Sequence, residues 1–191
     1  MQIIRRKVSL SVLRLMEHWL KIIPFRIGYY LAGFVDGEGS FNLSVRKGEG
    51  YRYGWQLGLS FNVSQRDKTN LYLLKRYLGC GRIKTRKDGL HSFVVENFTS
   101  LKERVTPFFE RFGFLSSRTK TNFSIFRKIV FLIDKKEHLN PEGFKKILDL
   151  REILNEGRGR KRKYNLKDVN FAQRKSPETI RRNPETNQDM I

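Results

Sequence analysis

The sequence contains few of the residues from which metal and redox centres are built. Cys80 is the single cysteine, which excludes an intramolecular disulfide and a thiolate zinc site. The three histidines, His18, His91 and His138, lie far apart and lack the spacing of zinc ligands. There is no Walker loop and no strand–GxGxxG–helix pattern, and no apolar run is long enough to span a bilayer. We therefore interpret Cys80 as a small packing residue.

Positive charge is abundant instead. The 191 residues include 39 Lys and Arg against 19 Asp and Glu, a formal net charge of +20. Clustered cations are rewarded by phosphate neutralisation and counterion release, so nucleic acid is the leading partner. An anionic membrane surface is the weaker alternative, because the basic residues are spread over strand-like segments and do not follow one amphipathic helix.

Hydrophobic periodicity predicts a mixed α+β chain. Residues 27–35 favour a helix, residues 40–46 and 55–65 alternate as strands, and residues 67–78 favour a second helix. Residues 79–97 predict a hairpin that turns at 87–89, and the pattern from 101 onward is helical. The order predicts an αββαββα core with a curved four-stranded antiparallel sheet and helices packed on one face. We divide the chain into an N-terminal extension (1–24), one domain (25–156) and a basic, flexible C-terminal tail (157–191).

The predicted sheet leaves one polar face uncovered. From Ser44 to Asp88 there are eleven Lys or Arg against three acids. A curved ribbon of strands with amides and guanidinium groups can enter the major groove of DNA, whereas a merely solvated face needs no such excess of one sign. The residues predicted to contact DNA on this saddle are Asn42, Ser44, Arg46, Gln56, Ser60, Asn62, Arg82, Lys84 and Arg86.

Two carboxylates, Asp36 and Glu38, stand among glycines at the end of the first predicted helix. They face the negative end of the helix dipole, at a cost of about 0.3–1 kcal/mol each, and they would repel phosphate. A divalent cation bridging carboxylate and phosphate removes both costs, because Mg²⁺ binds one or two carboxylates together with substrate phosphates. On spacing alone, two ordinary turn acids are the favoured interpretation.

The stretch LAGFVDGEG (Leu31–Gly39) resembles the LAGLIDADG motif of the homing endonucleases, DNA-cleaving enzymes encoded within mobile introns and inteins. The segments SFNLSV, FNVSQ and GCGRI and the helical region up to residue 163 are similar to later family segments, so the resemblance spans roughly 27–163. The last acid is Glu where the family name has Asp, and a longer carboxylate still reaches a cation.

The resemblance implies a role for each matching residue. Glu38 would hold the metal with the Gly37 carbonyl, and Asp36 would bond backbone amides with possible support of the active site. Gln65 would lie near the attacking water, and Lys120, with Arg118 as the reserve, near the scissile phosphate. The cofactor would be Mg²⁺, or Mn²⁺ or Ca²⁺ at the same site. The residues implied at a helix–helix dimer contact are Leu31, Ala32, Gly33, Phe34 and Val35.

One motif per chain implies a homodimer that cleaves a long pseudo-palindromic double-stranded DNA site. Two alternatives stay open: an RNA maturase that binds its own intron RNA, and a non-cleaving DNA-binding relative. No secretion signal is seen, and a bacterial cytoplasm, a chloroplast or a mitochondrion would suit such a protein. Residues 1–24 are interpreted as a helix packing on the domain, with an organellar targeting peptide as the less favoured alternative.

Overall fold

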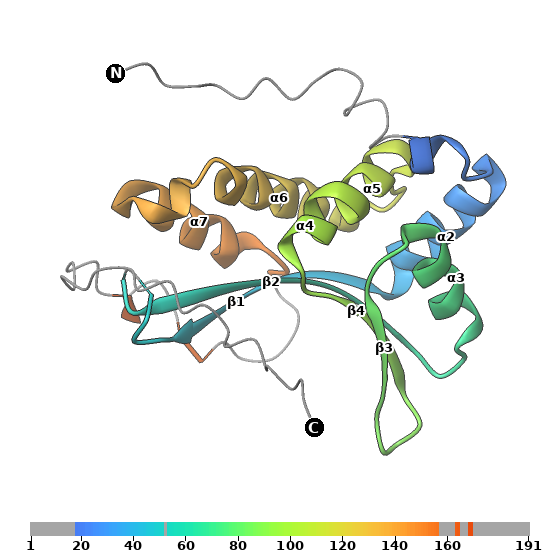
Figure 1. Ribbon diagram of the computed structural model, residues 1–191, viewed down its shortest axis with the longest axis horizontal. Coiled ribbons are helices and arrows are strands. Elements are labelled where there is room, and N and C mark those ends of the chain that lie inside the picture. Colours follow the sequence, from blue (N-terminus) through green and yellow to red (C-terminus); the bar gives the residue numbers. More distant parts are fainter. Residues whose placement is uncertain (1–17, 52, 157–162, 165–167, 170–191) are drawn as a thin grey trace, which may run out of the picture.

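The computed structural model describes residues 18–51, 53–156, 163–164 and 168–169. Helices and strands alternate in the order that the sequence predicts (Figure 1). In chain order they are α2 (Phe25–Glu38), β1 (Gly39–Lys47), β2 (Trp55–Gln65), α3 (Thr69–Leu78), β3 (Arg82–Thr85), β4 (His91–Val95), α4 (Phe98–Ser100), η1 (Leu101–Val105), α5 (Thr106–Phe112), α6 (Ser117–Asp134), η2 (Glu137–Leu139) and α7 (Pro141–Ile153). None of the helices in these ranges is long and apolar enough to cross a membrane.

The four strands form one antiparallel sheet in the order β1-β2-β4-β3. The helices lie on one side of this curved sheet and leave its other side open (Figure 1). The long β1–β2 pair runs from Gly39↔Val63 to Lys47↔Trp55, whereas β4 pairs only with the last part of β2, from Phe61 to Gln65. The α+β prediction and the predicted open face are confirmed.

Alternation along the two long strands separates the core from the open face. Phe41, Leu43 and Val45 of β1 are buried, and the residues between them are half-buried. Phe41 and Phe61 stack with their ring centroids 5.1 Å apart, and Phe109 from the helical layer meets Phe61 edge-on at 5.3 Å. All three rings are at most 1% exposed, so the aromatic core holds the strands and helices in register.

The outer edge of β1 is covered by the end of α7. The Arg151 guanidinium, 6% exposed, donates from Nε to the Leu43 carbonyl at 3.1 Å. Asn155, one turn further, donates from Nδ2 to the Phe41 carbonyl at 2.7 Å. These two bonds satisfy main-chain acceptors that would otherwise lie at a free strand edge.

The two ends of the chain depart from the predicted boundaries. Trp19 and Leu20 are half-buried against the core, and Ile23 is buried in it, which supports a packed rather than detached segment before residue 25. Residues 1–17 lie outside the described ranges. After residue 156 the flexible-tail prediction is corrected at two positions, because Val169 is buried and Tyr164 packs edge-on against Trp55 at 5.0 Å. The rest of the basic run, residues 157–162, lies outside the described ranges.

Helix α6 begins earlier than the periodicity predicts. The apolar pattern starts at 122, but the helix starts at Ser117 because Ser116 caps it and accepts a hydrogen bond from the Thr119 N–H through its Oγ. The extra turn contains Arg118 and Lys120, the two candidate basic residues of the site.

Candidate nucleic-acid interface and metal site

Asp36 joins the end of α2 to the start of α6 through hydrogen bonds. Its carboxylate accepts hydrogen bonds from the Leu115 N–H at 3.0 Å and the Ser116 N–H at 2.8 Å, and the Ser116 hydroxyl donates to it as well. The Thr119 hydroxyl donates to the main-chain carbonyl of Asp36 at 3.2 Å. The predicted bonds to backbone amides are therefore present, and they join two helices of the same chain.

The environment of Asp36 favours its ionised form. Partial burial raises its pKa, but the hydrogen bonds from Ser116, Thr119 and Leu115 outweigh that effect and bring the pKa below its ordinary value of 3.8. A carboxylate with its oxygens turned to three donors has little capacity left for a cation. Its geometry is that of a structural group.

Glu38, two residues further, differs from Asp36 in its exposure and its contacts. It is the last residue of α2, it is exposed, and among the described residues no hydrogen-bond or ion-pair partner meets its carboxylate. It lines a cavity of about 260 Å³ between the end of α2, the start of β1 and the α6–α7 side. The cavity is lined by Gly37, Glu38, Gly39, Ser40, Phe41, Asn42, Arg118, Thr119, Asn122, Asn155 and Glu156.

The donor atoms of this cavity suit a hard divalent cation. Its lining residues offer the carboxylates of Glu38 and Glu156 together with hydroxyl, amide and main-chain oxygens, with neither imidazole nor thiolate among them. Within the described ranges no group of three or more His, Cys, Asp or Glu is placed to hold a metal. One or two carboxylates fit a cation that completes its coordination from outside the chain, as Mg²⁺ does with substrate phosphates and water.

The two candidate basic residues differ in position. Arg118 lines the Glu38 cavity, whereas Lys120 is not among its lining residues. Two residues along an α-helix correspond to about 200° around its axis, so the two side chains leave α6 in nearly opposite directions. The cavity geometry therefore favours the reserve, Arg118, over Lys120 as the cation nearest to Glu38.

Gln65 ends β2 at the same end of the sheet as Glu38. The register pairs Gly39 with Val63, so Gln65 stands level with the last residues of α2. Its Oε1 accepts a hydrogen bond from the Arg66 N–H at 2.8 Å, which turns the amide NH₂ away from the main chain.

The burial of three residues corrects the predicted dimer segment, residues 31–35. Leu31 and Val35 are fully buried and Ala32 is 2% exposed, all in the core of their own chain, so their side chains are not available to a partner. Gly33 is exposed and Phe34 half-buried. A Cβ added to Gly33 or Gly37 would meet no atom within 4 Å. The accessible face of α2 therefore follows Gly33 and Gly37.

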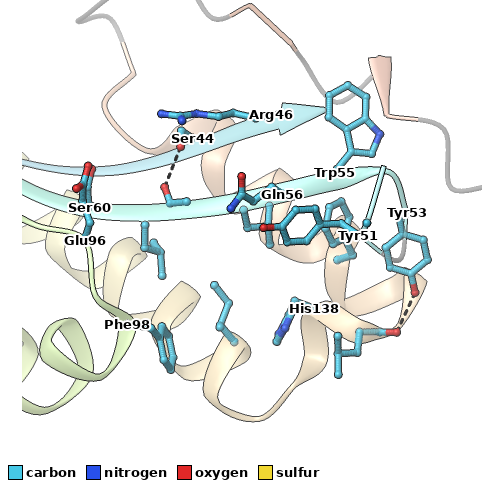
Figure 2. A pocket seen from close by; sticks show the side chains of 17 residues that line it. Ser44, Arg46, Tyr51, Tyr53, Trp55, Gln56, Ser60, Glu96, Phe98 and His138 are labelled. Atoms are coloured by element: carbon cyan, nitrogen blue, oxygen red, sulfur yellow. Dashed lines mark hydrogen bonds between the residues drawn. The ribbon is translucent and has the colours of Figure 1, made fainter. Parts of the chain in front are cut away.

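The predicted DNA-contacting side chains of β1 and β2 lie on or beside the open face. Arg46 pairs with Gln56 across the strands, and the Ser44 hydroxyl donates to the Gly58 carbonyl at 3.1 Å. Where β2 extends beyond β4, a second cavity of about 680 Å³ opens, with Gln56 and Ser60 on the strand side and residues of the helical layer opposite (Figure 2). It is separate from the Glu38 cavity.

The cations of the β3–β4 hairpin have acidic neighbours that the charge count did not predict. Arg82 pairs with Glu96, the Lys84 Nζ lies 4.0 Å from the same carboxylate, and Arg86 pairs with the adjacent Asp88. All of these side chains are about half exposed. Such exposed pairs are worth about 0–1 kcal/mol, so the cations can exchange their carboxylates for phosphate at small cost.

Sequence reasoning missed several residues that line the Glu38 cavity, among them the polar residues Asn122, Asn155 and Glu156. Asn122 lies within a helix predicted for its apolar face, and Asn155 follows a helix whose end has no glycine. Asn155 adopts φ 58°, a left-handed conformation that Asn tolerates better than most residues. An Asn after the last apolar position of a helix was the one available signal.

The open sheet carries exposed cations, and the exposed carboxylate of Glu38 lies at its end. A family model described as LAGLIDADG endonuclease matches residues 31–130, and the chain belongs to this family. A probable intron-encoded endonuclease 2 of Neurospora crassa is 32% identical over 132 residues, which cover 67% of this chain and 29% of that protein. The chain thus spans less than a third of that relative.

Two solved structures have the same fold. The archaeal intron-encoded homing endonuclease I-Vdi141I, complexed with DNA, superposes with a TM-score of 0.69 at 31% identity and covers 76% of this chain and 92% of its own. I-SmaMI, bound to an uncleaved DNA target in the presence of calcium ions, gives a TM-score of 0.64 at 31% identity. That match covers 69% of this chain and 46% of I-SmaMI.

Proposed function

We propose that this protein is a site-specific double-strand DNA homing endonuclease that acts as a homodimer and requires a divalent cation. The observation that carries the proposal is Glu38, an exposed carboxylate with no partner among the described residues, at the joint between α2 and the open sheet. At the C-terminal end of α2 it faces the negative end of the helix dipole, and a cation held against phosphate would offset that cost.

The homodimer follows from the number of carboxylates and the shape of α2. Cutting two strands requires two sites, and each chain supplies one Glu38. The exposed glycines Gly33 and Gly37 leave room for the backbone of a second α2, because no side chain separates two helices at a glycine. The match to nearly all of I-Vdi141I but to under half of I-SmaMI supports a unit that is half of a complete nuclease.

Mg²⁺ is the cation we favour, with Mn²⁺ and Ca²⁺ able to occupy the same oxygen donors. When bound, such a cation lowers the pKa of water and neutralises charge on the phosphate. Glu38 and the Gly37 carbonyl would hold it. The NH₂ group of Gln65, with its Oε1 tied to the main chain, would orient solvent. Arg118 would neutralise the phosphate as charge develops, with Lys120 kept as the alternative for that role.

The open face would read the target. Arg side chains pair with guanine and Asn or Gln with adenine in the major groove. Arg46 and Gln56 lie opposite one another on neighbouring strands, so one register pair offers both chemistries. The hairpin cations Arg82 and Lys84, weakly held by Glu96, would contact phosphate or base edges.

Cleavage of plasmid DNA tests the proposal. The substrate is a plasmid with the sequences that flank the coding element joined without it, and the reaction is run with Mg²⁺ and with EDTA. We expect linear product with Mg²⁺ only, and one discrete cut site. A plasmid that retains the interrupted junction is the matched control and should stay uncut. Absence of cutting together with faster splicing of the intron RNA would contradict the endonuclease and favour the maturase.

A further inference from the structure

The two long strands carry the same tripeptide, Ser-Phe-Asn, at residues 40–42 and 60–62. The antiparallel register places Phe41 opposite Phe61, and each Asn lies opposite the Ser of the other strand. Each Asn also donates from Nδ2 to the Oγ of the Ser two residues before it, at 3.0 Å for Asn42 and 3.1 Å for Asn62. The two strands therefore present the same polar pattern to the open face, related by a local two-fold axis through the phenylalanine pair.

Asn155 breaks this local symmetry. Its N–H donates to the Asn122 side-chain oxygen at 3.0 Å, and its Nδ2 donates both to the Phe41 carbonyl at 2.7 Å and to Asn42 Oδ1 at 3.1 Å. A main-chain carbonyl can only accept, so the Asn155 amide must turn its NH₂ toward β1. The atom of Asn42 that meets this NH₂ must then be its oxygen. In the described part of the chain Asn62 has no equivalent of this contact.

The fixed orientation decides what Asn42 can offer to a base. Specific reading of adenine by Asn needs a free oxygen to accept from N6 and a free NH₂ to donate to N7. In Asn42 the oxygen accepts from Asn155 Nδ2 and from the Ser40 hydroxyl at 3.3 Å, which uses both of its lone pairs, while one hydrogen of Nδ2 remains free. Asn42 can thus donate but cannot complete the adenine pair. Asn62 retains both groups.

We propose that Asn155 is a positioning residue for DNA specificity. It restricts Asn42 to donating, so that the base pair under Asn42 must present an acceptor such as guanine O6 or N7, whereas Asn62 keeps the bidentate pattern for adenine. The inference rests on the proposed DNA-binding function. It makes the end of α7, outside the strands themselves, a determinant of the recognised sequence.

Base-preference profiling tests the assignment. Full-length protein is incubated with a pool of randomised double-stranded DNA in EDTA, so that binding proceeds without cutting, and the bound sequences are counted. Asn42→Ala first identifies the base pair that Asn42 contacts. Asn62→Ala identifies a different pair and serves as the matched control for losing the same side chain on the twin strand.

Two changes at Asn155 then separate positioning from stability. Asn155→Gly keeps the left-handed backbone and releases the Asn42 oxygen, and we expect adenine to rise roughly fivefold or more at that base pair only. Asn155→Asp is isosteric and can only accept, so the Asn42 amide should turn its NH₂ to the new carboxylate and its oxygen to the groove. The preference should then move to adenine or cytosine, whose amino groups donate.

The outcomes are distinguishable. A changed preference at the Asn42 base pair in both variants, with the Asn62 base pair unaltered, supports the assignment. An unaltered preference accompanied by a lower unfolding midpoint would reduce Asn155 to a structural cap and overturn it. If the wild-type chain enriches no sequence while folding normally, the proposed DNA-reading function fails first, and this assignment fails with it.

Discussion

The two sides of helix α2 differ in the contacts that they make within the chain. The inner side carries Leu31 and Val35, both fully buried, and Asp36, whose carboxylate is bonded to the start of α6. The outer side carries Gly33 and Gly37, against which a Cβ would meet nothing, and the helix ends at Glu38. One nine-residue motif therefore packs into the fold on one side and makes no packing contact within the described chain at the two glycines of the other. That outer side is available to the partner and the cation proposed above.

The largest contrast is expected between the two acids. Glu38→Gln should lower the cleavage rate by roughly 10²–10³-fold or more, because the negative oxygen that would hold the cation is lost. Its free energy of unfolding should change by less than about 0.5 kcal/mol, since the side chain is exposed and bonds nothing within the described chain. Cleavage assays and urea denaturation measure both. Normal cutting by Glu38→Gln would remove this residue from the site.

Asp36→Asn should change the free energy of unfolding more than the cleavage rate. The N–H groups of Leu115 and Ser116 both bond Asp36 Oδ2, so the amide can keep its oxygen there and turn its NH₂ to the Ser116 hydroxyl. The loss of the negative charge weakens these bonds and costs about 1 kcal/mol of unfolding free energy. Asp36→Ala is the companion variant that removes all of these bonds, and it should cost about 1–3 kcal/mol. If Asp36→Asn unfolds like the wild type yet cannot cut, Asp36 belongs to the catalytic group after all.

Two glycines of α2, Gly28 and Gly33, allow the inner and outer sides of the helix to be compared without changing a charge. A Cβ at Gly28 would lie 2.2 Å from the Phe112 ring, so Gly28→Ala should destabilise the fold by about 1–3 kcal/mol. Gly33→Ala meets empty space and should stabilise the single chain by up to about 1 kcal/mol, while it weakens the proposed dimer. Denaturation and sedimentation separate the two effects. Unchanged self-association of Gly33→Ala, and of the bulkier Gly33→Leu, would move the dimer contact elsewhere.

Lowering the pH should destabilise the fold through Asp36, on the inner side of α2. The pKa of Asp36 is lower in the folded chain than its ordinary value of 3.8, so its contribution to stability is complete above that value and is lost as pH falls through the folded pKa. Urea midpoints measured from pH 6 down to about 3 should therefore fall less steeply in Asp36→Asn than in the wild type. An equal slope in both proteins would show that other carboxylates cause the acid sensitivity.

The smallest expected effect concerns the outer cations of the sheet. If Arg82 contacts phosphate, Arg82→Gln should lower the slope of log affinity against log salt by about one, and by the same amount on any DNA. If Arg82 reads a base, the loss should depend on the sequence instead. Glu96→Gln is a useful companion, because it releases Arg82 and Lys84 from their shared partner and should raise affinity slightly at low salt.

How far the sequence could predict the molecule depends on the range of the interactions involved. Strand alternation is local, so the buried positions Phe41 and Phe61 and the four-stranded sheet followed directly from the pattern. Glu38 was recognisable because its motif is contiguous. The burial of Leu31 and Val35 in their own chain could not be predicted. When a helix has apolar residues on more than one side, the sequence does not indicate which side packs against the core.

The details that could not be predicted depend on residues distant in sequence. The bonds of Asp36 to backbone amides were predicted, but its donors lie about 80 residues away and could not be named, and Asn155 meets β1 more than 110 residues away. No periodicity connects such partners. The choice between Lys120 and Arg118 depended on the register of the segment before α6, and a shift of two residues turns a side chain to the other side of a helix.

The bonds that Arg151 and Asn155 make to the edge of β1 also limit how two molecules can meet. The outward carbonyls of Leu43 and Phe41 are already occupied, so a strand of a neighbouring molecule would have to displace a buried guanidinium to extend the sheet there. Uncontrolled edge-to-edge growth, a hazard of open sheets, is thereby blocked at β1. The segment at the end of α7 thus protects the molecule from aggregation through the outer edge of β1, and the glycine side of α2 remains exposed.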